Sequence, residues 1–227
     1  MHIMKESEST CARCTIKLSE RICRNPDGKS LPNCPTRDKQ RLLKMSQEAY
    51  ENPAVSKFAR QASIQEAEGY SNRELGYDFV RPAKPRILEI IEFSKKMKYK
   101  RIGLAFCAGL TKEAKAVDRL FSSNGFDLTS VICKVGRVPK EAIGIQDDQK
   151  IAIGCFESMC NPILQAMVLN DAKTELNVLL GLCVGHDSLF LQHAKAPCTV
   201  LAVKDRLLGH NPLAAIYNID GYYRALK

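Results

Sequence analysis

Apolar and amphipathic segments alternate along the second half of the chain. Short apolar runs, which are typical of buried strands, lie at 101–106, 128–133, 176–180 and 198–203. Amphipathic stretches typical of helices lie between them, at 111–124, 161–170 and 187–194, the last with Asp187 as its expected cap. Alternating strands and helices indicate a parallel sheet covered on both faces. We therefore predict an α/β fold with an open, mostly parallel, Rossmann-like three-layer sheet, and a further strand at 151–153.

Helical patterns dominate the stretch before the first strand. One helix is expected from Thr36, its cap, to about Tyr50, and a second from Asn52 and Pro53 to about residue 68. A third spans roughly 85–98, and a last short helix begins after Asn211 and Pro212. The predicted organisation is a cysteine-rich knuckle at 1–36, a helical connector at 37–82 and an α/β domain at 83–227.

Composition and charge narrow the class of protein. The chain has 227 residues, is 45% hydrophobic and has a net charge of +9, but its basic residues are spread out. The one dense basic cluster, at 95–101, lies at the end of a predicted helix, where cations interact favourably with the negative end of the helix dipole. We favour this interpretation of the cluster over a phosphate-binding patch. The polar start at 1–10 has no export signal, and no apolar run is long enough to cross a bilayer. We therefore expect a soluble, cytoplasmic protein with no membrane partner.

Four cysteines open the chain with the spacing Cys11-x2-Cys14-x8-Cys23-x10-Cys34. In a cytosolic chain such a set indicates metal ligation before disulfides. Tetrahedral structural zinc takes four thiolates, and a Cys-x2-Cys pair can clasp one side of the ion. The prediction is a zinc knuckle at Cys11, Cys14, Cys23 and Cys34. An iron–sulfur cluster and a reduced, loosely ordered leader are the alternatives.

Four further cysteines fall at the same edge of the predicted sheet. Cys107, Cys133 and Cys183 each follow a strand, and Cys160 precedes a helix. Ligands of open parallel sheets sit beyond the carboxyl ends of the strands. These four cysteines are therefore predicted to converge on a second site, which binds zinc or an iron–sulfur cluster. The alternative is that each is a small core residue.

Other residues near this edge are weaker candidates. His186, next to Cys183, is either a metal ligand, an acid/base group or a plain loop histidine. The segment 204–212 follows the last strand and is either a contact for an anionic ligand or a surface turn. Cys155 is a substitute ligand, whereas Cys198 is expected in the core and His193 on the surface.

Several of these segments resemble a known family. The stretches MCNP at 159–162, GLCVGHD at 181–187 and VKDRLLGHNP at 203–212, with Leu176-Asn177-Val178 and the cysteines at 11, 14 and 34, resemble an uncharacterised prokaryotic family of predicted metal-binding proteins, a domain of unknown function. The resemblance covers nearly the whole chain and implies metal binding. It implies no reaction, because the family has no established activity.

Three functions remain open from the sequence. The first is a protein with a structural zinc knuckle and a second zinc or iron–sulfur site, acting on a small anionic substrate or with a redox partner. The second is a metal-free thiol enzyme with Cys183 or Cys160 as nucleophile and His186 as base. The third, a zinc-dependent module for nucleic acid or protein, is weakened for nucleic acid because no recognition helix or aromatic platform is evident. Nucleotide-binding and hydrolase motifs are absent.

Overall fold

The computed structural model describes residues 8–227, which form two compact units. One unit ends at Ile64 and the other is Gln65–Lys227, so the boundary falls inside helix α3 (Pro53–Glu68). The finer division predicted at 36/37 and 82/83 stays a prediction. Most of the polar start at 1–10, where no export signal was expected, lies outside the described residues.

The first unit begins with short elements and continues as helices. These elements are η1 (Cys11–Arg13), η2 (Leu18–Glu20), α1 (Pro35–Asp38), α2 (Gln40–Tyr50) and the start of α3. Thr36 was predicted to cap a single helix, and this is wrong. Cys34 is the extended residue before α1 and Pro35 is its first residue, because the proline ring already fixes a helical φ. Lys39, with φ −110° and ψ 41°, then separates α1 from α2.

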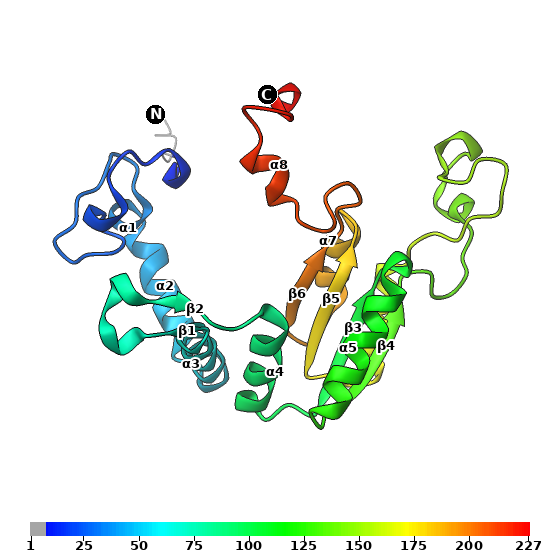
Figure 1. Cartoon of the computed structure of the whole chain (residues 1–227), viewed down its shortest axis with the longest axis horizontal. Helices are drawn as coiled ribbons and strands as arrows, with labels where there is room; N and C mark the ends of the chain where they lie inside the picture. Colours follow the sequence, from blue (N-terminus) through cyan, green and yellow to red (C-terminus); the bar gives the residue numbers. More distant parts are fainter. Residues whose placement is uncertain (1–7) are drawn as a thin grey trace, which may run out of the picture. The chain divides into compact units, whose positions relative to one another are not determined.

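The second unit is built on a four-stranded parallel sheet, labelled in Figure 1. Its strands are β3 (Arg101–Phe106), β4 (Asp127–Ile132), β5 (Leu176–Leu182) and β6 (Cys198–Val203), in the order β4-β3-β5-β6. A separate antiparallel pair consists of β1 (Tyr70–Ser71) and β2 (Arg81–Pro82). All seven residues of β5 are buried, as expected for a strand covered on both faces.

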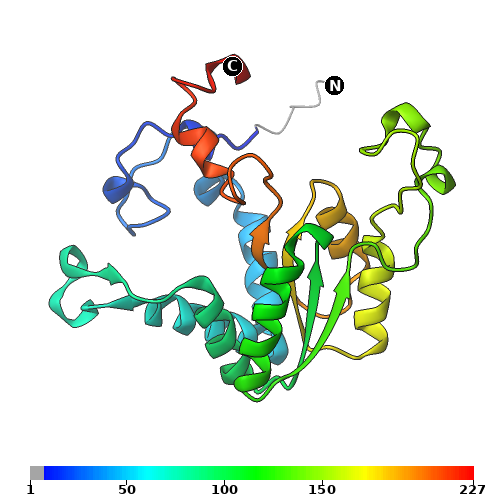
Figure 2. The same ribbon diagram turned by 45° about the vertical axis from the view of Figure 1, so that its right-hand side comes forward.

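Helices cover both faces of this sheet. Helices α4 (Arg86–Met97) and α5 (Thr111–Ser123) pack with strand residues into one hydrophobic cluster, and α6 (Pro162–Asp171) and α7 (His186–His193) into another. Figure 2 shows α5 lying over β3 and β4. The predicted three-layer α/β fold is therefore confirmed. The remaining elements are helix α8 (Leu213–Tyr217) and short 3-10 turns at Arg73–Leu75, Tyr77–Phe79, Ala108–Leu110, Lys140–Ile143, Asp147–Gln149 and Arg224–Leu226.

Two local predictions are wrong for identifiable reasons. Residues 151–153 form no strand, because the N–H groups of Ile151 and Ala152 donate to the carboxylate of Glu157 rather than to a neighbouring strand. Asp187 does not cap α7: Gly185, with φ +81°, holds that position. The Asp187 carboxylate instead accepts from the adjacent N–H of Ser188.

Within residues 8–227, no helix is both long enough and apolar enough to span a membrane.

Candidate functional site

The order of the strands defines a crevice at the carboxyl edge of the sheet. From β3 the chain crosses to β4 on one side, and then returns past β3 to β5 and β6 on the other. Open α/β sheets bind ligands at such a reversal, beyond the ends of the two strands that flank it. Here those strands are β3 and β5, and the residues that follow them are Cys107 and Cys183. Two predicted site residues therefore lie at the crevice.

Backbone hydrogen bonds bring the other two cysteines to the same edge. Cys133 follows β4, and its N–H donates to Phe106 O over 2.8 Å. Asn161 N–H donates to Cys133 O over 2.7 Å, which fixes Cys160, its neighbour, beside the end of β4. Asn161 also caps α6, because its Oδ1 accepts from Leu164 N at 3.0 Å.

The four cysteines line one small cavity of about 10 Å³. Its complete lining is Cys107, Cys133, Cys160, Gln165, Leu182, Cys183 and His186. All ten cysteines of the chain are free thiols. A cavity of this size has room for about one water-sized species. The structure thus brings together Cys107, Cys133, Cys160 and Cys183, with His186 beside them.

Gln165 adds an unsatisfied polar atom to the cavity. The residue is fully buried, and its Nε2 donates to Val131 O at 2.8 Å and to Phe106 O at 3.2 Å. These two bonds fix the amide orientation and leave Oε1 as an acceptor with no partner among the described residues. A buried acceptor of this kind costs about 1–3 kcal/mol unless a donor reaches it. Gln165 Oε1 is therefore available to accept a hydrogen bond from a group in the cavity.

Cys133 and Cys160 share a proton. The pKa of Cys160 is lowered to about 5, chiefly by a hydrogen bond from the Cys133 thiol and also by Lys134 and His186, against the opposing effect of burial. The same bond and burial raise the pKa of Cys133. Ala108 N–H also donates to Cys133 Sγ at 3.3 Å. The pair therefore holds one thiolate, and Cys160 carries it.

Cations surround the cavity. Arg206 Nη2 donates to Cys183 Sγ at 3.1 Å, and Lys134 Nζ donates to Ser158 O. Lys204 follows β6, and its N–H donates to Leu182 O at 3.1 Å, which places it at the same edge. Of these cations, Lys134 favours the thiolate form of Cys160.

The remaining sequence candidates lie elsewhere. Cys155 is exposed on the loop between β4 and α6 and does not line the cavity. Cys198 begins β6 at the opposite edge and packs against a core cluster, as expected. His193 is exposed at the end of α7, also as expected.

The N-terminal cysteines line a second cavity, of about 60 Å³, within the first unit. Cys11, Cys14, Cys23 and Cys34 all contribute to it. The loop between them is held by Arg21, whose Nη2 donates to Cys14 O at 3.0 Å. Gly28 allows the chain to turn back, because a Cβ there would lie 2.4 Å from the backbone of Arg21.

In neither set are the thiols within residues 8–227 as close together as the ligands of a metal ion would be. Within residues 8–227, no three His, Cys, Asp or Glu side chains are grouped closely enough to hold an ion. Ligation at either cavity would require its sulfurs to move inward to about 2.3 Å from the ion.

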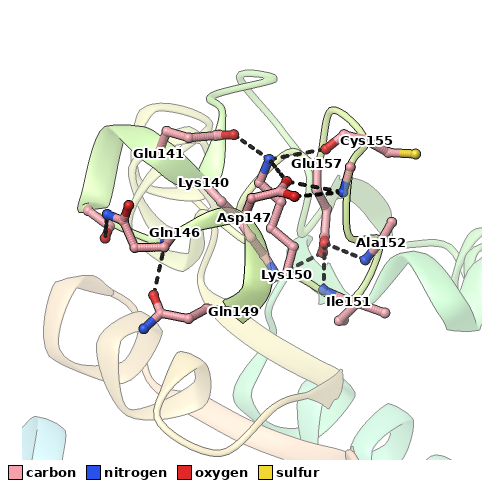
Figure 3. A network of polar contacts seen from close by, with 12 residues as sticks. Lys140, Glu141, Gln146, Asp147, Gln149, Lys150, Ile151, Ala152, Cys155 and Glu157 are labelled. Carbon is pink, nitrogen blue, oxygen red and sulfur yellow. Dashed lines mark hydrogen bonds and ion pairs between the residues drawn. The ribbon is translucent and has the colours of Figure 1, made fainter.

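A polar network organises the long loop that separates Cys133 from Cys160 (Figure 3). Lys150 Nζ contacts the carboxylates of Glu141 and Asp147, the latter at 3.0 Å, and is only 6% exposed. Glu157 accepts from Lys140 Nζ at 2.8 Å. The two ends of the loop pair through Lys140 N–H to Glu157 O, 3.0 Å, and Met159 N–H to Val138 O, 2.8 Å. The sulfur of Cys155 points away from this network.

Sequence reasoning missed Gln165. It lies one helical turn after Asn161, on the face of α6 that is turned toward the sheet. Its spacing from Asn161 could have predicted this position. A polar residue four positions after an N-cap at the sheet edge lies on the same helix face, above the same crevice.

Comparison with known proteins gives a family but no activity. A family model described as "Protein of unknown function (DUF1847)" matches residues 34–201. The uncharacterized protein MJ0455 of Methanocaldococcus jannaschii is 50% identical over 134 residues, which is 59% of this chain and 67% of that protein. No solved structure matches.

The family match includes Cys34 and all four cysteines at the sheet edge, whereas Cys11, Cys14 and Cys23 precede it. Since the model matches most of the chain, the chain belongs to this family of proteins of unknown function.

Proposed function

We propose that the protein binds a thiophilic metal ion, zinc in the first instance, in the cavity at the carboxyl edge of its sheet. The observation that carries this is the convergence of Cys107, Cys133, Cys160 and Cys183, from four separate segments, on one cavity. Thiolates are the ligands that zinc prefers in four-coordinate sites. The neighbouring cations and the shared proton of Cys133 and Cys160 keep thiolate available for ligation.

The size of the cavity favours a single ion. About 10 Å³ accommodates one small species, and an iron–sulfur cluster would require the surrounding elements to separate. His186 is the alternative ligand for any cysteine that stays unbound, and a bound ion would supply Lewis-acid chemistry at the crevice. Gln165 Oε1 would accept a hydrogen bond from a protic group held there.

We further propose a structural zinc site at Cys11, Cys14, Cys23 and Cys34. The four thiols line one cavity in a unit whose short elements bury no residue. A segment without a core needs another source of folding free energy, and metal binding supplies it in many small modules.

Elemental analysis of full-length protein, purified without oxygen, tests both sites. We expect about two zinc ions per chain. Replacing Cys160 and Cys183 together by Ser should remove one equivalent, and replacing Cys11 and Cys14 by Ser should remove the other. Cys198→Ser, a core thiol at the opposite edge, is the matched control and should retain both.

The outcomes separate the alternatives. Iron with a visible charge-transfer absorbance, lost on replacing Cys160 and Cys183, would assign a cluster to the edge instead of zinc. Metal content that is unaffected by those replacements would reject the edge site.

A second function, metal-free thiol chemistry, is favoured by one observation. Cys160 is held as thiolate by the Cys133 thiol, with His186 nearby to act as base. In that case Cys160 should be alkylated near neutral pH with a rate that levels off above about pH 5, whereas an ordinary thiol would level off near its much higher pKa. Cys133→Ala should move the inflection of Cys160 upward.

A further inference from the structure

Lys204 is a cation without a counter-charge at the edge of the crevice. It is half-buried, it follows β6, and no residue among 8–227 pairs with its Nζ. The adjacent Asp205 forms no ion pair with it; Asp205 Oδ1 instead accepts from the N–H groups of Leu207 and Leu208, at 3.0 and 2.8 Å. Arg206, the other cation of this loop, is directed at Cys183 Sγ.

Two glycines show where the Lys204 ammonium lies relative to Cys107. A methyl group built on Gly109 would lie 3.6 Å from Lys204 Nζ and 3.9 Å from Cys107 Sγ. One built on Gly181 would lie 3.8 Å from the same Nζ. The ammonium and the Cys107 sulfur therefore flank one small volume above Gly109. That volume stays clear because Gly109 has no side chain, whereas the space above Gly181 is filled by Leu110, whose Cδ1 would lie 2.1 Å from a Cβ there.

We propose that this volume binds a small anionic ligand, with its carboxylate or phosphate group on Lys204 and its remaining part toward Cys107. A half-buried ammonium with no partner gains most from an anion, since solvent only partly screens the interaction. The inference rests on the proposed function in that the ligand approaches the same thiols.

Paired alkylating reagents test the charge preference directly. Full-length protein, before and after incubation with a chelator, is treated with anionic iodoacetate and with neutral iodoacetamide, and modification of Cys107 is quantified by peptide mass spectrometry. Lys204→Met should lower the iodoacetate-to-iodoacetamide rate ratio at Cys107 by about three- to fivefold, the size expected for one nearby charge. Lys204→Arg should retain the ratio.

Two further variants control the experiment. Lys195→Met removes a cation at the opposite edge of the sheet and should leave the ratio unchanged. Gly109→Ala should slow both reagents alike, because its methyl group occupies the volume at ordinary contact distances from its neighbours. Inorganic phosphate should protect Cys107 of the wild type from iodoacetamide and fail to protect Lys204→Met.

The inference is overturned if Lys204→Met has the wild-type ratio, or if Lys195→Met lowers it equally. Its failure is distinct from that of the proposed function, which is measured by metal content. A chain that purifies without metal but shows the charge preference would reject the metal site and retain the anion site.

Discussion

Gly103 in β3 shows how a single missing side chain shapes the interior of the sheet. A Cβ at this position would lie 2.2 Å from Asn177 Oδ1 and 2.8 Å from Leu169 Cδ1. Asn177 is fully buried on the adjacent strand, and its Oδ1 accepts from the Thr174 hydroxyl at 2.8 Å. The glycine therefore makes room for a buried polar pair and for a helix of the neighbouring layer.

Gly103→Ala should accordingly lower the free energy of unfolding by about 1–3 kcal/mol, through overpacking. Gly221→Ala is the matched control, because its nearest neighbour would be 3.7 Å away, and it should change stability by no more than about 0.5 kcal/mol. Urea denaturation of the two variants measures the difference. Equal stabilities would contradict the packing argument.

Individual residues mark the limit of what the sequence could predict about the site. The convergence of Cys107, Cys133 and Cys183 was predictable, because each directly follows a strand of a parallel sheet. The unsatisfied oxygen of Gln165 was not, since it depends on which carbonyls its amide meets. The position of Lys204 Nζ depends on side-chain conformation as well.

At the scale of elements, periodicity predicted the strands and most helices of the second unit. β3 and β6 have the predicted bounds, and α6 begins at the predicted cap, Asn161. The predicted strand at 151–153 is wrong because a short apolar run has the same sequence pattern in a loop as in a strand. Only the hydrogen bonds of the backbone distinguish the two. There a side-chain carboxylate satisfies the backbone.

That carboxylate gives a pH prediction for the loop. Hydrogen bonding from Lys140 lowers the pKa of Glu157 to about 2, against an ordinary 4.5. Because the folded pKa is depressed, the contribution of this group is complete above about pH 4.5 and is lost as the pH falls through about 2. The amide NMR shifts of Ile151 and Ala152, which donate to Glu157, should titrate with a midpoint near 2.

Lys140→Met should raise that midpoint toward the ordinary value, because it removes the largest cause of the shift. A wild-type midpoint already near 4.5 would show that the network of Figure 3 does not form in solution.

For the molecule as a whole, the two units differ in what stabilises them. The second has two clusters of buried hydrophobic residues, whereas α1, α2 and the short turns before them bury none. Fold class was predictable because the alternation of strands and helices extends over the whole second half of the chain. The order β4-β3-β5-β6 was not, since it depends on the direction of each crossover.

This difference predicts a selective response to metal removal. A strong chelator should increase amide hydrogen exchange across 11–36, because that segment has no core to hold it, while β3 and β5 stay protected. Hydrogen-exchange mass spectrometry measures both regions at once. Replacing Cys11 and Cys14 by Ser should reproduce the effect without chelator, and protection at 11–36 that survives both treatments would exclude a folding role for metal.

The paired ends of the loop between Cys133 and Cys160 have a consequence for how members of the family can diverge. Because Val138 bonds to Met159 and Lys140 to Glu157, the chain leaves and re-enters the sheet edge at nearly one place. Insertions or deletions beyond that junction need not disturb the spacing of the two sulfurs. The excursion can therefore vary in length, or be exchanged for another recognition element, while the chemistry beneath it is inherited unchanged.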